Sequence, residues 1–251
     1  MNEILVYFLI IAIGFFAGIV NTLAGGGSLL TLPLLIFLGL PPAVANGTNR
    51  IGIFIQTATS VAGFKSKGIQ PSRFSFYLGI WALIGSLIGA RIAVTLDEEI
   101  FNKILAVIMV LVVIFMLVKP KTANNKPKTE QTLLKKSIGG ILFFLIGIYG
   151  GFIQAGVGIL ILFALSTVHR FSLVQSNAIK AIVVGIYTVA ALSIFIYNDQ
   201  VNYTYGLILA AGNAGGGWIA SRWSVNKGDG LVKFFLLVMV IAMAIKLWVD
   251  S

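Results

Sequence analysis

Long apolar stretches alternate with short polar ones along the chain, and ten can be marked: 4–23, 28–40, 43–64, 74–95, 98–118, 136–154, 158–168, 172–197, 203–222 and 231–249. Many are close to the ~20 residues that an α-helix needs to cross the hydrocarbon core of a bilayer. They lack the period-two alternation of transmembrane β-strands. In hydrocarbon every backbone polar group needs an internal partner, so we predict an all-α, polytopic transmembrane helical bundle.

Composition supports a membrane protein. Of 251 residues, 58% are hydrophobic and 10% are charged, whereas a soluble domain carries about a quarter charged residues. The net charge is +10, but Lys and Arg lie mostly in loops, where they set orientation in the bilayer rather than bind nucleic acid. The absence of Cys excludes disulfides and thiolate metal sites. We predict no cofactor and no metal, and a homodimer is expected only by analogy with other transporters.

The two halves of the chain repeat each other. Asn46 and Asn177 are 131 residues apart (177 − 46), and Arg91 and Arg222 are separated by the same offset. The polar stretch 119–136 between the halves holds six Lys and two Pro. We therefore divide the chain into a first transmembrane repeat at 1–118, a basic cytoplasmic linker at 119–135 and a second transmembrane repeat at 136–251.

Each repeat opens with a broken apolar segment. Residues 4–40 would form a helix of about 55 Å at 1.5 Å per residue, far beyond the ~30 Å hydrocarbon core. The run Gly25-Gly26-Gly27-Ser28 breaks it, and Gly156-Val157-Gly158 breaks 136–168 in the second repeat. The chain either crosses the membrane once in broken form or folds back as a hairpin.

Loop charge favours the hairpin. If both broken segments fold back, the loops at 65–73, 119–136, 169–171 and 222–230 fall on one, strongly basic side. The positive-inside rule makes that side cytoplasmic. Each half then has a hairpin plus three full crossings, so the repeats are inverted and both termini lie outside.

Two cations inside membrane segments are candidate binding residues. Arg50 and Lys180 each lie about eight residues into partner segments, within Asn46-Gly47-Thr48-Asn49-Arg50 and Ser176-Asn177-Ala178-Ile179-Lys180. No Asp or Glu lies deep in a predicted helix to neutralise them. Intramembrane charges are expensive and usually functional, and a guanidinium fork suits an oxyanion. Alternatively, both side chains reach an interface or bond backbone carbonyls of the broken helices.

The breaks can serve the same site. A helix that restarts in mid-membrane presents free N–H groups and a positive dipole end to an anion, and Asn21 and Gln154 precede the two breaks at matching positions. The alternative is that the glycines only allow a tight turn and close packing. The predicted substrate-binding set is Asn21, Gly25, Gly26, Gly27, Ser28, Asn46, Thr48, Asn49, Arg50, Gln154, Gly156, Gly158, Asn177 and Lys180.

Other residues receive structural interpretations. Arg91 and Arg222 lie near helix ends and are expected to reach the interface. The GxxxG pairs Gly14/Gly18, Gly147/Gly151 and Gly85/Gly89 are helix-packing signals. His169, the single His, is expected to be exposed in a loop. An intramembrane serine enzyme is disfavoured, because Ser28 has no predicted base nearby.

These motifs resemble the TauE/SafE sulfite exporter family. The stretch 14–28 reads GFFAGIVNTLAGGGS, followed by Pro33 and ANGTNR at 45–50, while the second copy reads GGFIQAGVG at 150–158 and SNAIK at 176–180. The resemblance covers nearly the whole chain. It implies a secondary transporter that moves sulfite, organosulfonates or related sulfur-containing anions, often outward, across the bacterial inner membrane.

The sequence therefore predicts a multi-pass secondary transporter that moves a small anion by alternating access. An anion channel lined by the same residues remains the alternative. Saturable transport and counterflow would indicate a carrier, whereas single-channel currents would indicate a pore.

Overall fold

The computed structural model describes residues 3–70, 72–117 and 133–225, and every regular element in these ranges is an α-helix. The helices are α1 (Glu3–Leu23), α2 (Ser28–Phe37), α3 (Pro42–Ser66), α4 (Arg73–Thr95), α5 (Glu98–Leu117), α6 (Leu133–Phe152), α7 (Val157–Thr167), α8 (Leu173–Tyr197) and α9 (Tyr203–Trp223). The all-helical class is confirmed, and nine predicted segments appear as these helices. The tenth, 231–249, and most of the linker lie outside the described residues. The helix predicted from 136 begins earlier, at Leu133.

Polar residues mark where several helices begin. Ser72 accepts a hydrogen bond from the backbone N–H of Phe74 at the start of α4. Ser172 and Asn202 cap α8 and α9 in the same way. A side-chain oxygen at this position satisfies a backbone donor that has no partner inside the helix. The helix starts are therefore encoded locally, at the polar residues between apolar stretches.

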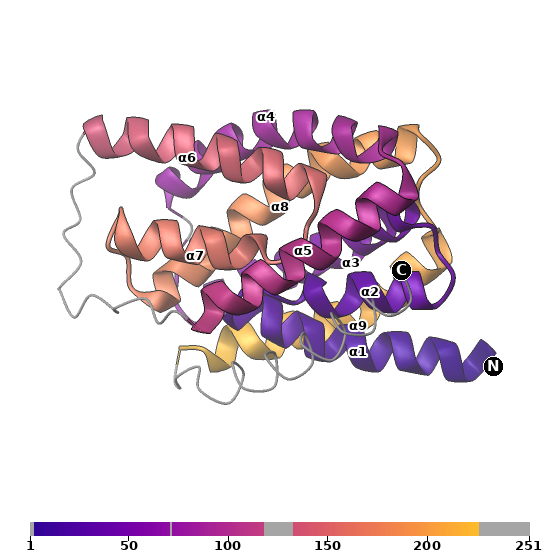
Figure 1. Cartoon of the computed structure of the whole chain (residues 1–251). Helices are drawn as coiled ribbons and strands as arrows, with labels where there is room; N and C mark the ends of the chain where they lie inside the picture. The colour runs from indigo at the N-terminus through magenta and orange to yellow at the C-terminus, as the bar shows by residue number, and fades with distance from the viewer. Residues whose placement is uncertain (1–2, 71, 118–132, 226–251) are drawn as a thin grey trace.

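The first broken segment folds back on itself. Gly25 has a left-handed backbone (φ +81°), and a Cβ built on Gly27 would collide with the carbonyl oxygen of Ala17. A straight helix would separate residues 17 and 27 by about 15 Å, so the chain has reversed. The second segment turns at Gly156 (φ +73°), and α7 runs back along α6 as α2 does along α1 (Figure 1). Both segments therefore fold back as hairpins, while the side of the membrane that each faces stays a prediction.

The helices approach one another through glycine. Helix α1 packs along α9, and α4 packs along α6. A Cβ on Gly89 would collide with the carbonyl oxygen of Ile148, and a Cβ on Gly216 with that of Phe15. All six glycines of the predicted GxxxG pairs face a neighbouring backbone in this way. In a bilayer, where apolar side chains gain little by leaving lipid, such close backbone contact drives helix association.

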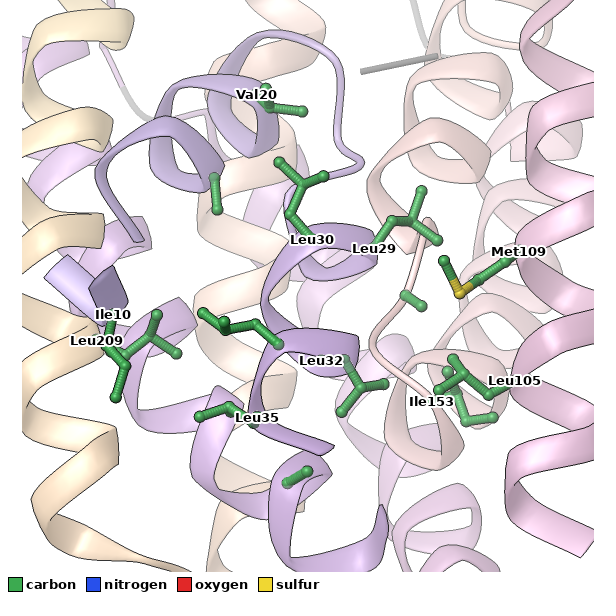
Figure 2. Packing of buried hydrophobic residues seen from close by; sticks show 14 of the residues in the cluster. Ile10, Val20, Leu29, Leu30, Leu32, Leu35, Leu105, Met109, Ile153 and Leu209 are labelled. Atoms are coloured by element: carbon green, nitrogen blue, oxygen red, sulfur yellow. The ribbon is translucent and has the colours of Figure 1, made fainter. Parts of the chain in front are cut away.

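The apolar residues divide between a core and an outer face. Leu29 and Leu32 of α2 pack near Met109 and Leu105 of α5 and near Ile153 beside the second break (Figure 2). Many large apolar side chains instead face outward, among them Ile4, Phe8, Phe16, Ile80, Ile84, Ile141 and Leu145. Such a surface requires lipid rather than water as its solvent.

Among the described residues, four helices are long and apolar enough to cross a bilayer: α1, α4, α6 and α8. Helix α3 has 25 residues but is less apolar, because it carries Asn46, Asn49, Arg50 and Gln56, all buried inside the protein. The polar side chains that interrupt the hydropathy pattern are therefore the ones that the bundle encloses.

Candidate functional site

The two helix breaks meet inside the bundle. A Cβ placed on Gly25 would collide with the backbone of Gly158, and a Cβ on Gly158 would collide with Gly25. Only glycine allows two backbones to come this close. The C-terminal ends of α1 and α6 and the N-terminal ends of α2 and α7 are thereby gathered near one point, as Figure 1 shows for the hairpin turns.

Arg50 on α3 reaches across to the end of α6. Its Nη1 donates to the carbonyl oxygen of Gly150 and to Oε1 of Gln154, both at 3.1 Å. Its Nη2 donates to the carbonyl oxygen of Gly151 at 2.6 Å and to Oδ1 of Asn46 at 3.4 Å. The guanidinium also lies 4.8 Å from the ring centroid of Phe195. Arg50 has no exposed surface.

Lys180 on α8 does the same for the end of α1. Its Nζ donates to the carbonyl oxygens of Asn21 and Thr22 at 2.7 and 2.9 Å. It also donates to Oδ1 of Asn177 at 2.7 Å. Lys180 is 3% exposed. Both cations therefore sit where the last carbonyls of a broken helix lack partners within that helix.

Each cation is assisted by an Asn on its own helix. Asn46 donates to the carbonyl oxygen of Phe152 at 2.7 Å, and Asn177 donates to that of Leu23 at 3.2 Å. Helix α3 of the first half thus caps the broken helix of the second half, and α8 of the second half caps the broken helix of the first. A positive charge at a helix C-terminus is favourable because it opposes the negative end of the dipole. The structure therefore shows the alternative arrangement, in which both side chains bond backbone carbonyls of the broken helices.

This positive charge has no described carboxylate beside it. Glu3, Asp97, Glu98, Glu99 and Asp199 are the acidic residues in the described ranges, and all are exposed. The acceptors of Arg50 and Lys180 named above are neutral carbonyls and amides. Within the described ranges, no three His, Cys, Asp or Glu side chains come together as a possible metal site. Among the described residues, the side-chain charges at the centre of the bundle are therefore the two cations Arg50 and Lys180.

A second pair of hydrogen bonds links the residues before the breaks to α3 and α8. Asn21 donates to Oε1 of Gln56 at 2.6 Å, and Gln154 donates to the hydroxyl of Tyr187 at 3.0 Å. We did not predict Gln56 or Tyr187. A signal was present, because they are 131 residues apart, the same offset that relates Asn46 to Asn177. Gln56 also donates to the hydroxyls of Thr22 and Ser60.

The remaining predicted residues do not all lie together. Gly26, Gly27 and Gly156 form the turns themselves, and Ser28 is the first residue of α2. Asn49 accepts a hydrogen bond from Thr31 of α2 at 2.6 Å. Thr48 points elsewhere, because its hydroxyl accepts from the backbone N–H of Asn202 at 2.8 Å. Residues two positions apart on a helix are rotated by about 200° around its axis, so Thr48 does not share the face of Arg50.

The two outer arginines agree with their structural interpretation. Arg91 and Arg222 are exposed, and the guanidinium of Arg222 lies 5.2 Å from the ring centroid of Trp218. Neither belongs to the central group.

His169 corrects a prediction, since it is 1% exposed rather than a surface residue. Its ring lies 5.0 Å from that of Phe74 between centroids, and a Cβ on Gly139 would lie 2.9 Å from its Nε2. The loop after α7 folds over α6 at a glycine, and this covers the imidazole. Burial, aided by the positive charge of Lys135, lowers the pKa of His169 to about 4.

This burial predicts a pH-dependent stability. An exposed His has a pKa of about 6.5, so between pH 6.5 and 4 the unfolded chain binds a proton that the folded chain excludes. Stability is therefore full above pH 6.5 and falls as pH drops towards 4. We expect the melting temperature of purified protein to fall between pH 7 and 5.5, and His169→Gln to fall less. Equal losses in both proteins would contradict this, since no other His is present.

Comparisons with known proteins agree with the geometry. The family model described as sulfite exporter TauE/SafE matches residues 10–247. A "Probable membrane transporter protein" from Haemophilus influenzae is 26% identical and covers 97% of this chain and 94% of its own. "Probable membrane transporter protein ORF9" from Sinorhizobium sp is 24% identical, with 98% and 93% covered.

"Probable membrane transporter protein YfcA" from Escherichia coli K12 is 25% identical, and the match covers 94% of this chain and 87% of the relative. No solved structure matches the chain. The family model spans both hairpins, both buried cations and the α1–α9 and α4–α6 contacts. This multi-pass membrane protein belongs to the TauE/SafE sulfite exporter family of membrane transporters.

Proposed function

We propose that this protein is a secondary transporter that carries sulfite, an organosulfonate or a related small sulfur-containing anion out of a bacterial cell across the inner membrane. The observation that carries this proposal is the pair of buried cations at the meeting point of two broken helices. The name of the matching family supports the sulfur anion, and the names of the relatives support transport.

The charge balance favours an anion as cargo. Burying a charge without a charged partner costs free energy, which hydrogen bonds repay only in part. Arg50 is in that position within the described ranges, because its acceptors are neutral and the described carboxylates are all exposed. Lys180 adds a second buried cation. An oxyanion arriving between the breaks would neutralise charge and compete with the carbonyls for the same N–H donors. The N-terminal ends of α2 and α7 would add two positive dipole ends.

The helix contacts support two inverted repeats. Matching the halves equates α1 with α6, α3 with α8, and α4 with α9. Under this exchange the α1–α9 contact becomes the α6–α4 contact, and α3–α9 becomes α8–α4. A bundle related by a pseudo-twofold axis would have both members of each pair, as this one does. We therefore propose alternating access by rocking of one hairpin and its neighbours against the other.

In this structure the carbonyls at the ends of α6 and α1 hold the two cations. Contact between Gly25 and Gly158 closes the centre. Entry of the anion would draw Arg50 or Lys180 away from the helix ends and allow the hairpins to part. With an inside-negative membrane potential, outward movement of each negative charge is favoured by ~2.3 kcal/mol per 100 mV. Export then needs no buried carboxylate as a proton carrier.

The direct test is flux into proteoliposomes that hold the purified full chain. We expect saturable uptake of labelled sulfite or sulfoacetate, weaker uptake of sulfate, and acceleration by unlabelled anion on the opposite side. Such counterflow requires a carrier. Single-channel currents without counterflow would favour the anion channel, and absence of flux for every sulfur anion would overturn the proposed substrate class.

A further inference from the structure

A cavity of about 310 Å³ lies at one end of the bundle, apart from the closed centre. It sits among the end of α3, the start of α4 and the start of α8, with the connections between them. We name this the basic end, because Lys65, Lys67, Arg73 and Arg170 are exposed in these connections. Gln70 and Gln175 line the cavity and are themselves exposed, so it opens to the surrounding medium.

The polar wall of the cavity suits an anion. Ser72 and Ser75 are the cap and third residue of α4, and Gln175 is the third residue of α8. Two helices of 23 and 25 residues therefore begin at this wall with their positive dipole ends. No acidic residue is among those that line it. The hydroxyl of Ser75 is buried and has no hydrogen-bond partner within the described part of the chain.

The unpaired Ser75 hydroxyl is the second sign of a ligand. A buried polar group without a partner costs free energy, and an oxyanion in the cavity would accept its hydrogen bond. The opposite wall is apolar, with Phe64, Phe171, Ile179 and Ile182. A fully hydrated inorganic ion gains nothing from such a wall, whereas an anion with an apolar part buries that part against it.

The floor of the cavity lies level with the central site. Ala178, Ile179 and Ile182 line it and are within two residues of Lys180 on α8. From Gln175 at the wall to Lys180 the helix rises only about 7.5 Å. A ligand in the cavity is therefore separated from Lys180 by little more than the thickness of α8.

We propose that this cavity is an entry vestibule at the basic end, where an oxyanion with a small apolar part binds to Ser75 and Gln175 before it reaches Lys180. This rests on the proposed function, because a vestibule needs a transport path behind it. It adds a second binding site, specificity residues and a preference for organic over inorganic anions. It also predicts that the basic end faces the side of the membrane from which the anion is taken.

The absence of Cys allows a clean test with single cysteines in the full chain. Gln70→Cys, at an exposed wall residue that is not a proposed ligand, should react with a membrane-impermeant maleimide from one side of the membrane only. Benzenesulfonate should slow this labelling at least threefold, and sulfate should slow it less. Ser66→Cys, an exposed position at the same end that does not line the cavity, should be unaffected. Adding Ser75→Ala removes one hydrogen bond to the ligand. The benzenesulfonate concentration needed to protect the cysteine should therefore rise about 3- to 10-fold.

Unprotected Gln70→Cys, or equal protection of Ser66→Cys, would overturn the vestibule. Ile69→Cys, at the neighbouring position in the cavity wall, repeats the test if Gln70→Cys does not fold. Wild-type flux measured in parallel separates the two proposals. If the wild type transports a sulfur anion but benzenesulfonate does not protect the cysteine, the vestibule alone is refuted. If benzenesulfonate protects the cysteine but no sulfur anion is transported, the binding site stands and the transport proposal is refuted.

Discussion

Arg50→Gln is expected to reduce anion flux by at least tenfold while the protein still folds. The guanidinium donates three hydrogen bonds to residues at the second break and one to Asn46 on its own helix, and it is one of the two buried cations. Hydrogen bonds to a charged group contribute about 1.5–3 kcal/mol each, so losing one such contact to the anion lowers affinity about 10- to 100-fold. Initial rates of sulfite or sulfoacetate uptake into proteoliposomes measure the effect.

Control variants separate charge, geometry and folding. Arg50→Lys keeps the charge but loses the fork, so we expect an intermediate rate. Lys180→Gln should lose transport as Arg50→Gln does, whereas Arg222→Gln, which removes an exposed cation, should transport normally. Melting temperatures identify variants that fail through instability. Wild-type rates in folded Arg50→Gln and Lys180→Gln would show that both cations only cap helix ends.

Gly25→Ala is expected to abolish transport and to lower the melting temperature strongly. Gly25 combines a left-handed backbone, φ +81°, with backbone contact to Gly158. The backbone conformation costs about 1–2 kcal/mol for a residue with a Cβ. Forcing a methyl group into a closed contact costs about 1–3 kcal/mol more. Because the clash lies where the two breaks meet, it should also hold them apart and stop the cycle.

Two further glycines separate these contributions. Gly39 has φ +91° but nothing within 4 Å of a built Cβ, so Gly39→Ala tests the backbone conformation alone. Gly158 has the contact without a positive φ, so Gly158→Ala tests the clash alone. We expect Gly39→Ala to transport and Gly158→Ala to resemble Gly25→Ala. Normal flux and stability in Gly158→Ala would contradict the closed contact between the breaks.

Helix positions were predictable because their causes are local. The segment predicted at 172–197 is the helix Leu173–Tyr197, since apolar length and a polar cap at Ser172 both reside in that stretch. The breaks at Gly25 and Gly156 were predictable for the same reason, as each has a positive φ that glycine tolerates. The division at 1–118, 119–135 and 136–251 and the membrane orientation stay predictions.

Errors arose where the answer depended on contacts between helices. His169 lies in a loop and was expected to be exposed. Instead it fits the space left by Gly139 of α6 and packs against the ring of Phe74 of α4, and these contacts bury it. Thr48 is two residues before Arg50, but it turns towards Asn202. Gln56 and Tyr187 were overlooked because a single polar residue in an apolar helix says little until its partner is known.

Hydropathy, glycine runs and charge act over a few residues, so they were enough to predict an all-helical membrane protein with two broken segments and two cations inside its apolar segments. What those cations contact depends on the packing of helices that are distant in sequence. Arg50 bonds Gly150 at a separation of 100 residues, and Lys180 bonds Thr22 at a separation of 158. No local pattern encodes such partners, because glycine contacts between helices bring them together and the buried donors then bond the carbonyls at the helix ends.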